Sequence, residues 1–227
     1  MKVMVISLGG SLIVPNEVDY KFLKNFKRII TKLSKKYKFV IVTGGGRVAR
    51  IYINALAKEG LDEKTKSLIG IGITRFNARF MARFFEKIAG QNIPHSLREV
   101  KNMLAKDKII FAGGLRYEAD NTSDGTSAHV ANLFKANLIN LTNVNGLYTK
   151  NPKVFKDAKF IPKISINDFY KIATKIKYKA GQHFVLDQHA ATLIKRYRIK
   201  TYILNGKNLK NFENFLKGKR FIGTAIY

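Results

Sequence analysis

Three clusters of glycine each follow an apolar stretch that is typical of a buried strand. They are Gly9-Gly10 with Ser11, Gly44-Gly45-Gly46, and Gly113-Gly114. In a parallel sheet the carboxyl ends of the strands form the ligand crevice, and glycine there lets backbone N–H groups approach phosphate oxygens. One such cluster is more often a plain turn, but three that fall after strands predict a phosphate-binding edge.

Charged residues beside these clusters are the candidates for chemistry. Arg50 follows the second cluster by one helical turn, and a guanidinium binds phosphate oxygens well, although a surface arginine is an equal alternative. Arg75 is a weaker candidate of the same kind. Asp124 and Asp187 each lie at the edge of a predicted helix beside small residues. They could hold Mg²⁺ or orient substrate groups, and an N-cap would explain either without function.

Other kinds of site are disfavoured. The glycines match neither the phosphate motif GxxxxGK[ST] nor the dinucleotide motif GxGxxG. The four histidines show no metal-ligand spacing and no distinctive Ser-His-Asp order, and the chain has no cysteine for a disulfide or a thiolate metal site. Hydrolase and structural-zinc functions are therefore disfavoured.

The composition predicts a folded globular protein, with 46% hydrophobic residues in 227. No apolar run reaches the roughly 18 residues of a membrane helix, and the start resembles a strand and turn, so we expect a cytoplasmic protein without a membrane partner. The net charge of +27 permits nucleic-acid binding, but lysines are spread along the whole chain, as a coding bias would produce. Such a surface attracts anionic nucleotides in either case.

Apolar periodicity predicts alternating strands and helices, which is typical of a mainly parallel sheet with helices on both faces. The predicted strands are Lys2–Leu8, Phe39–Thr43, Lys108–Phe111, Asn137–Leu141, Lys200–Leu204 and Arg220–Ile226. The predicted helices are Asp19–Tyr37, Arg47–Lys58, Leu68–Ile88, Ser96–Ala105, Ser127–Lys135, Ile166–Thr174, Val185–Tyr197 and Leu209–Leu216. Tyr117–Ser127 is predicted as a mobile loop and Thr149–Pro162 as an irregular segment. We expect one domain over 1–227, with an acceptor-binding half to about residue 120 and a nucleotide-binding half after it.

Seven segments in order carry a resemblance to a known family. They are ISLGGSLI, VTGGGRVARIYI, IGIGITRFNA, IIFAGGL, LTNVNGLYTKNP, KAGQHFVLDQHAA and FIGTAI. In this order the chain resembles the archaeal-type uridylate (UMP) kinases of the amino acid kinase superfamily along nearly its full length. The resemblance implies an α/β fold, a three-layer α/β/α sandwich with a mainly parallel central sheet, which binds ATP and the acceptor end to end.

The resemblance also implies roles for particular residues. For ATP it implies Gly10, Ser11, Gly46 and Arg50 near the phosphates, and Thr142, Asn143, Tyr148 and Asn151 near the nucleoside. For UMP it implies Gly45, Ser67, Gly114, Leu115, Thr122 and Ser123. Asp124, Asp187 and Arg50 match positions that arrange the transfer.

The implied reaction is ATP + UMP giving ADP + UDP with Mg²⁺ as cofactor, in a homohexamer that supplies pyrimidine nucleotides and binds no specific nucleic acid. The chain departs from the family pattern in places. Ser7 replaces a lysine, Ser67 replaces an acid that contacts UMP, and Asn145 and Asn151 replace two acids near ATP. The sequence therefore leaves two alternatives open, a kinase with another small acceptor and a nucleotide-binding homologue impaired in catalysis.

Overall fold

A single sheet organises the molecule. The computed structural model describes residues 1–117, 122–152, 154–175 and 186–227. These residues form a seven-stranded sheet in the order β3-β2-β1-β4-β8-β9-β7 and a separate pair, β5-β6. The strands are β1 (Lys2–Leu8), β2 (Tyr37–Thr43), β3 (Ile109–Ala112), β4 (Asn137–Thr142), β5 (Leu147–Tyr148), β6 (Phe160–Ile161), β7 (Lys163–Ile164), β8 (Thr201–Asn205) and β9 (Thr224–Ile226). All neighbours in the large sheet run parallel except β8 and β9, so the predicted mainly parallel sheet is confirmed.

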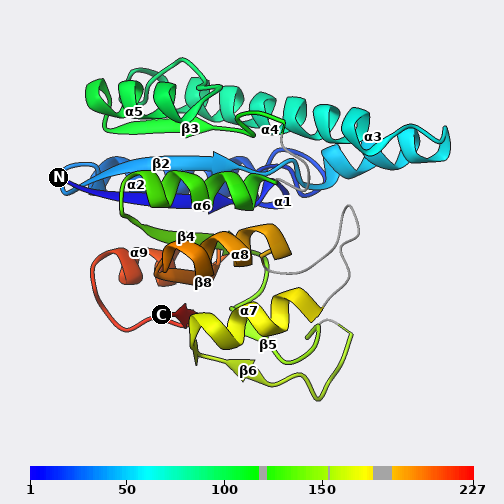
Figure 1. The fold of residues 1–227 in the computed structure, drawn as a ribbon. Helices are drawn as coiled ribbons and strands as arrows, with labels where there is room; N and C mark the ends of the chain where they lie inside the picture. Colours follow the sequence, from blue (N-terminus) through cyan, green and yellow to red (C-terminus); the bar gives the residue numbers. More distant parts are fainter. Residues whose placement is uncertain (118–121, 153, 176–185) are drawn as a thin grey trace.

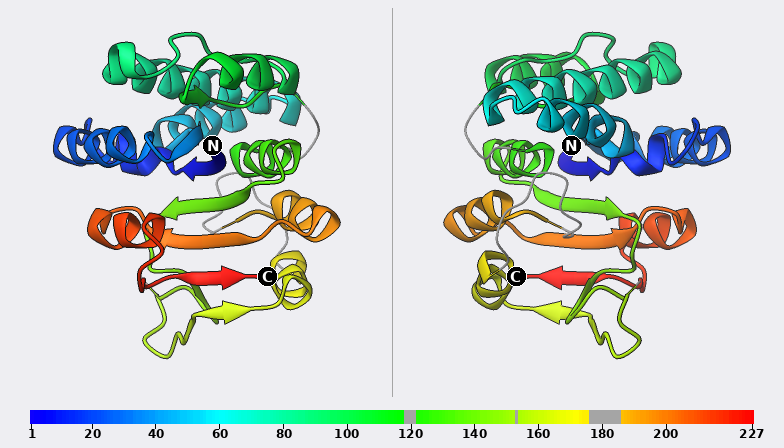
Figure 2. Two further views of the ribbon diagram at one scale, coloured as in Figure 1. Left: turned by 90° about the vertical axis from the view of Figure 1, so that its left-hand side faces the viewer. Right: turned by 90° about the vertical axis from the view of Figure 1, so that its right-hand side faces the viewer.

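Helices cover both faces of the sheet (Figure 1). They are α1 (Gly10–Ile13), α2 (Tyr20–Leu33), α3 (Gly46–Lys58), α4 (Glu63–Phe85), a 3-10 turn at Glu86–Ile88, α5 (Leu97–Lys106), α6 (Ser123–Leu133), α7 (Ile166–Lys175), α8 (Gln188–Tyr197) and α9 (Leu209–Leu216). Figure 2 shows α2 and α9 on one face and α6, α7 and α8 on the other. No helix within the described ranges is long and apolar enough to cross a lipid bilayer.

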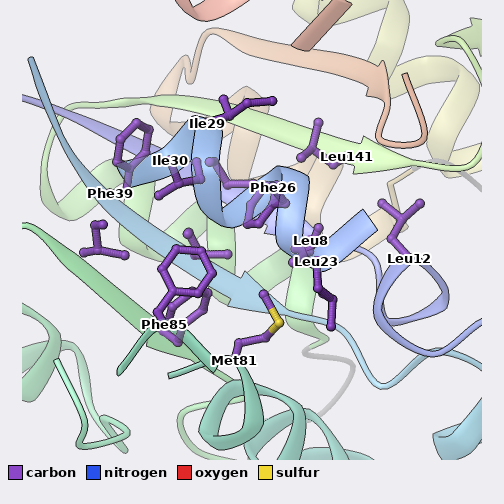
Figure 3. Packing of buried hydrophobic residues seen from close by; sticks show 14 of the residues in the cluster. Leu8, Leu12, Leu23, Phe26, Ile29, Ile30, Phe39, Met81, Phe85 and Leu141 are labelled. Atoms are coloured by element: carbon purple, nitrogen blue, oxygen red, sulfur yellow. The ribbon is translucent and has the colours of Figure 1, made fainter. Parts of the chain in front are cut away.

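The strands alternate their side chains between two cores. Ile6 and Phe39 belong to the core under α2, α9 and the end of α4, whereas Val5 and Val40 belong to the core under α5 to α8. Figure 3 shows the first core, in which Phe26 of α2 lies among aliphatic and aromatic side chains. Because both faces of the sheet are buried, its strands are almost continuously apolar, and the sequence shows them clearly.

Helix starts follow capping side chains more closely than apolar periodicity. Helix α4 begins at Glu63, five residues before the predicted Leu68, because Asp62 accepts a hydrogen bond from the N–H of Thr65 at 2.7 Å. Helix α6 begins at Ser123, four residues before the predicted Ser127, because Thr122 caps it. These two early turns matter because both contribute to the candidate site described below.

Four predicted segments need correction. The end of the predicted loop Tyr117–Ser127 is helical from Ser123, and residues 118–121 lie outside the described part of the chain. The predicted strand Arg220–Ile226 is reduced to Thr224–Ile226. The segment Thr149–Pro162 contains β6, one of three two-residue strands that periodicity cannot detect. In the predicted helix Val185–Tyr197 the first residue lies outside the described ranges, and the helix begins at Gln188.

Candidate active site

The three glycine turns meet at one edge of the sheet. Leu8 at the end of β1 lies opposite Thr43 of β2 and Leu141 of β4, and Val42 lies opposite Ala112 of β3. Because these strands are parallel, the turns that follow β1, β2 and β3 leave the sheet from its carboxyl edge. The predicted convergence of the glycine clusters is therefore confirmed.

The first two turns contact each other through their backbones. The N–H of Gly44 donates to the carbonyl oxygen of Leu8 at 2.9 Å. A Cβ atom on Gly10 would lie 2.4 Å from the carbonyl oxygen of Gly44 and 2.5 Å from the nitrogen of Gly46. Gly46 also adopts a φ of +62°, which favours glycine. Glycine is thus required at both positions, and the backbone amides of the two turns lie side by side.

Helix α4 fixes the third turn. The N–H of Gly114 donates to Thr74 Oγ1 at 2.8 Å, and Arg75 Nε donates to the Gly114 carbonyl at 2.8 Å. Arg75 also donates to the Leu115 carbonyl. Burial lowers the pKa of Arg75 from its ordinary value, with the charge of Glu99 opposing the shift, and the guanidinium stays charged at neutral pH. Arg75 therefore holds the start of the segment that follows β3, and its predicted role in binding phosphate stays a prediction.

A cavity of about 240 Å³ lies between the second and third turns and helices α3, α4 and α6. Six residues predicted from the sequence line it: Gly45, Gly46, Ser67, Gly114, Thr122 and Ser123. Five of them were predicted for the acceptor, and Gly46 for the ATP phosphates. The N-terminus of α3 at Gly46 and that of α6 at Ser123 both border the cavity, and helix N-termini attract anions. The cavity therefore combines glycine turns and two helix dipoles suited to a phosphate.

Sequence reasoning missed other residues of the same cavity. Glu63, Lys66 and Thr74 line it, and none belongs to a glycine motif. The four-residue spacing of Glu63 and Ser67 on one helix was a usable signal, but the predicted helix began too late to include Glu63. Leu115, in contrast, is predicted to meet UMP, yet its side chain is buried in the core under α5 to α8.

Two carboxylates from distant parts of the chain lie beside the cavity. Ser7 Oγ donates to Asp124 Oδ1 at 2.7 Å. Thr122 Oγ1 donates to Asp187 Oδ2, and it accepts from the N–H of Asp124 at 3.1 Å. Asp187 also caps α8 by accepting from the N–H of Ala190 at 2.7 Å. Thr122 thus contacts both acids and lines the cavity. Asp187 caps α8, as one of the two roles considered for it from the sequence predicts.

The environment of Asp124 changes its acidity. The side chain is enclosed, and burial raises the pKa of Asp124 from 3.8 to about 7, with a further increase from the negative charge of Asp187. The hydrogen bond from Ser7 opposes this shift. Asp124 is consequently a carboxyl that changes charge near neutral pH in the ligand-free protein.

Arg50 and the residues predicted for the ATP nucleoside lie apart from the cavity. Arg50 is half-buried on α3 and does not line it. The carbonyl oxygen of Thr142 accepts from the N–H of Gly206 at 2.8 Å, at the ends of β4 and β8. The Tyr148 ring lies 5.4 Å from that of Phe160. These positions share the carboxyl edge or the β5–β6 pair beside it, and their roles in binding ATP stay predictions.

Comparison with known proteins assigns the family. The model of the amino acid kinase family matches residues 2–205. The chain belongs to the amino acid kinase family. The predicted family, fold class and phosphotransferase activity are therefore confirmed.

Relatives of this amino acid kinase match it end to end. The chain is 34% identical to the uridylate kinase of Methanobrevibacter smithii over 224 residues, which cover 98% of each chain. It is 36% identical to the uridylate kinase of Thermoplasma acidophilum over 226 residues, which cover 98% of this chain and 96% of the relative. The crystal structure of uridylate kinase from Archaeoglobus fulgidus superimposes with a TM-score of 0.85 at 32% identity, over the whole of both chains.

Proposed function

We propose that this amino acid kinase transfers the γ-phosphoryl group of ATP to UMP and so forms ADP and UDP. The observation that carries the proposal is the cavity that five residues predicted for the acceptor line together, at the edge where the glycine turns meet. The end-to-end match to uridylate kinases supports the same acceptor. The product would supply pyrimidine nucleotide synthesis.

The acceptor phosphate lies between the N-termini of α3 and α6 in this proposal. Gly45 and Gly46 offer backbone N–H groups there, and Ser123 adds a hydroxyl, while Gly114 and Thr122 line the cavity wall. A phosphate oxygen of UMP attacks the γ-phosphorus of ATP, and the bond from that phosphorus to the β,γ-bridging oxygen breaks. Because the protein contributes little covalent chemistry to such a step, positioning and charge neutralisation provide most of the acceleration.

The phosphates of ATP lie along Gly10, Ser11 and Gly46, where the turns after β1 and β2 touch. Gly46 both contacts Gly10 and lines the acceptor cavity, so it lies where the two phosphate chains meet. Thr142, Asn143, Tyr148 and Asn151 bind the nucleoside further along the edge. Arg50 supplies a cation near the transferred group.

Mg²⁺ enters with ATP in this proposal. Within the described ranges no group of three or more His, Cys, Asp or Glu side chains is arranged to hold a metal. Mg²⁺ commonly needs only one or two carboxylates in addition to substrate phosphates, and the partly exposed Asp187 fits that requirement better than the enclosed Asp124. When bound, the ion neutralises charge on the phosphates.

A kinase with another small acceptor is the second candidate, and the cavity itself favours it. Ser67 lines the cavity and provides a hydroxyl, whereas the family resemblance implies an acid there, and Lys66 and Arg116 add positive charge. ADP release should be measured with UMP, CMP, dUMP, carbamate, acetylglutamate and isopentenyl phosphate. We expect the highest kcat/KM with UMP. A higher value with another acceptor would replace UMP, and ATP binding without turnover of any acceptor would indicate a homologue impaired in catalysis.

The chain assembles with copies of itself in this proposal, as a hexamer in the cytoplasm. Helices α3 and α4 pack against each other and carry large exposed apolar side chains. These are Ile51, Tyr52, Leu68, Ile69 and Phe76. Exposed apolar surface of this kind favours association. Light scattering coupled to size exclusion should give six times the 25.7 kDa chain mass, and a monomer at micromolar concentration would contradict the assembly.

A further inference from the structure

Helices α2 and α9 lie on the same face of the sheet (Figure 2), and this face is strongly basic. Ten exposed Lys and Arg side chains belong to the two helices and to the short segments that follow them, and we call these ten side chains the basic face. They are Lys21, Lys24, Arg28, Lys32, Lys35, Lys36, Lys210, Lys217, Lys219 and Arg220. Over residues 20–36 and 209–220 the one acid is Glu213. Positive charge therefore accumulates on this part of the surface.

The helices of the opposite face are less basic. Helices α5 to α8 contain seven Lys or Arg and three Asp or Glu in 41 residues. Helices α2 and α9 contain six Lys or Arg and one Glu in 22 residues. The net charge per residue is thus about twice as high on α2 and α9. A coding bias that spreads lysines along the whole chain does not by itself predict this difference between the two faces.

Helix α2 presents its exposed cations as one stripe. Four of them follow one another at intervals of three or four residues, so they lie on one side of the helix over about 16 Å. They are Lys21, Lys24, Arg28 and Lys32. The apolar side chains of the helix are buried on its other side. The fold therefore fixes the direction in which the stripe points, which is away from the sheet.

The single acid between these cations is neutralised within α9. Lys217 Nζ lies 2.5 Å from Glu213 Oε1. This hydrogen bond lowers the pKa of Glu213 and burial opposes the shift, while the charges of Lys32 and Arg28 on α2 lower the pKa further. The cations of the two helices thus lie close enough to act on the same group. Among the described residues, no carboxylate forms an ion pair with the four cations of the stripe. The stripe therefore presents uncompensated positive charge to the solvent.

The residue types on the basic face distinguish between possible anionic partners. Every apolar side chain of α2 after Tyr20 is buried, so the helix has no apolar row that could enter a lipid bilayer. Eight of the ten cations are lysines. Lysine is depleted in protein–protein interfaces, where arginine and aromatic side chains are enriched. The basic face is therefore poorly suited to a membrane or to an acidic protein.

A nucleic-acid backbone matches the charge and the length of the stripe. Binding to phosphodiesters requires only positive point charges, because release of counterions from the nucleic acid drives the association. One strand of a duplex carries a phosphate about every 3.4 Å along the axis, so a stripe of about 16 Å faces about five phosphates. Four cations in a row are thus suited to one strand.

We propose that the basic face binds the phosphodiester backbone of a nucleic acid without regard to base sequence. This binding goes beyond phosphoryl transfer and does not depend on it, because none of the ten side chains lines the acceptor cavity. The absence of base recognition agrees with the expectation that the chain binds no specific nucleic acid. Single-stranded RNA and duplex DNA share the backbone chemistry, and the experiment distinguishes them.

The test measures fluorescence anisotropy of two labelled probes with the full-length protein. One probe is a single-stranded RNA of about 20 nucleotides and the other is a DNA duplex of about 20 base pairs, both of mixed sequence and both longer than the stripe. We expect log Kd to rise linearly with log salt concentration between about 50 and 200 mM. The probe with the lower Kd identifies the kind of nucleic acid.

A triple variant removes three charges from the stripe, with Lys24→Gln, Arg28→Gln and Lys32→Gln combined. Because three phosphate contacts are lost, the slope of log Kd against log salt should fall by about two for the RNA and by nearly three for the duplex. At about 100 mM salt the Kd should rise at least about 100-fold. The kcat and the KM for ATP should match those of wild type, since α2 does not line the cavity.

A matched control removes the same charge from the opposite face. It combines Lys101→Gln, Lys106→Gln and Lys175→Gln, three exposed positions on α5 and α7. Both triple variants lower the net charge by three, so a difference between them isolates the place of the charge. We expect the control to bind both probes nearly as wild type does, because exposed charges more than about 10 Å away are largely screened at this salt concentration. Far-UV circular dichroism and thermal melts check that both variants are folded.

Three results would overturn the proposal. Equal losses of affinity in the two triple variants would assign the binding to the total charge of the chain. A Kd that does not change with salt, or no binding at about 50 mM salt, would exclude contacts to phosphates. Sedimentation of the protein with vesicles of phosphatidylcholine and phosphatidylserine, lost in the α2 variant and without binding of either probe, would assign the basic face to a membrane.

Discussion

The two sides of the sheet's carboxyl edge differ in how much they depend on side chains. Around β1 and β2 the turns contact each other through backbone atoms, such as the N–H of Gly44 and the carbonyl of Leu8 at 2.9 Å. Around β4 and β8 a backbone hydrogen bond from Gly206 to Thr142 at 2.8 Å is joined by a side-chain pair, Asn205 Nδ2 and Asn145 Oδ1 at 3.0 Å. The contact between the first two turns therefore depends on glycine and backbone atoms, whereas the β4–β8 end also uses side chains that other residues can replace.

Substitution of Gly10 should have the largest effect on activity, because Gly10 belongs to the side of the edge where backbone atoms of two turns touch. In Gly10→Ala the new methyl group would lie 2.4 Å from the Gly44 carbonyl oxygen, which cannot move without displacing the second turn. We expect kcat/KM to fall by more than about 100-fold and the free energy of unfolding to fall by about 1–3 kcal/mol, the usual cost of overpacking. Steady-state kinetics and urea unfolding measure the two quantities.

Gly72→Ala is the matched control for that experiment. Gly72 lies inside α4, and a Cβ atom there would meet nothing within 4 Å. Alanine should therefore stabilise the helix by up to about 1 kcal/mol and leave activity unchanged. Equal behaviour of the two variants would contradict the role that we assign to the Gly10–Gly46 contact.

Asp124 lies where the two sides meet, and its titration should change stability with pH. Its pKa is raised from 3.8 to about 7 in the folded protein, so the folded state retains a proton that the unfolded state has lost. Stability from this group is present below about pH 4 and is lost as the pH rises through about 7. Asp124→Asn should therefore gain Tm relative to wild type between pH 4.5 and pH 8, by about 2–4 °C for each kcal/mol.

Thermal melts of both proteins without ligands measure this difference. A Tm difference that does not change with pH would show that Asp124 titrates normally in the folded protein. In the protein that keeps Asp124, Ser7→Ala should raise the pKa of the Asp124 carboxyl further, because the hydrogen bond from Ser7 lowers this pKa.

Arg75→Ala tests how strongly a side chain supports the third turn. The guanidinium donates to the carbonyl oxygens of Gly114 and Leu115, and both acceptors would lose a charged donor. We expect the KM for the acceptor to rise about 10-fold and the KM for ATP to change little, as for a lost hydrogen bond to a charged group. Arg79→Ala, at an exposed position one turn further along α4, should change neither. A larger change in the KM for ATP than for the acceptor would contradict this assignment.

We expect the smallest effect on activity from a side-chain substitution at the end of β4 and β8. Asn205→Ala removes two exposed hydrogen bonds, one to Asn145 and one from the N–H of Lys207, each of which contributes about 0.5–1.5 kcal/mol at most. The KM for ATP should rise less than about 10-fold, with the acceptor unaffected. An effect as large as that of Gly10→Ala would remove the contrast between the two sides.

The sequence predicted the parts of the fold that periodicity or glycine position encodes. Helix Leu209–Leu216 and strand Lys2–Leu8 agree residue for residue, because each has a long apolar pattern. The two-residue strands β5, β6 and β7 depend on partners far along the chain, for example Lys163 beside Ala225, and no local pattern shows them. Tertiary pairing decides such elements.

The candidate site was likewise predictable only where a local sequence pattern encodes it. The glycine turns were found because glycine clusters directly after predicted strands, whereas Thr122 and Ser123 were predicted only through the family resemblance. Glu63 and Lys66 were missed because acids and lysines are common in a helix, and only the cavity distinguishes them. The burial that raises the pKa of Asp124 depends on β1, α6 and the segment before α8 together, so no stretch of sequence contains it.

The close approach of Gly10 to Gly46 has an evolutionary consequence. The groups that we propose to bind phosphate belong to the main chain, and a point mutation elsewhere cannot delete them. The rest of the cavity lining includes side chains on the first two turns of α4, which a few codon changes would exchange. This separation would let genes that descend from one ancestor evolve specificity for new metabolites while they keep the same reaction.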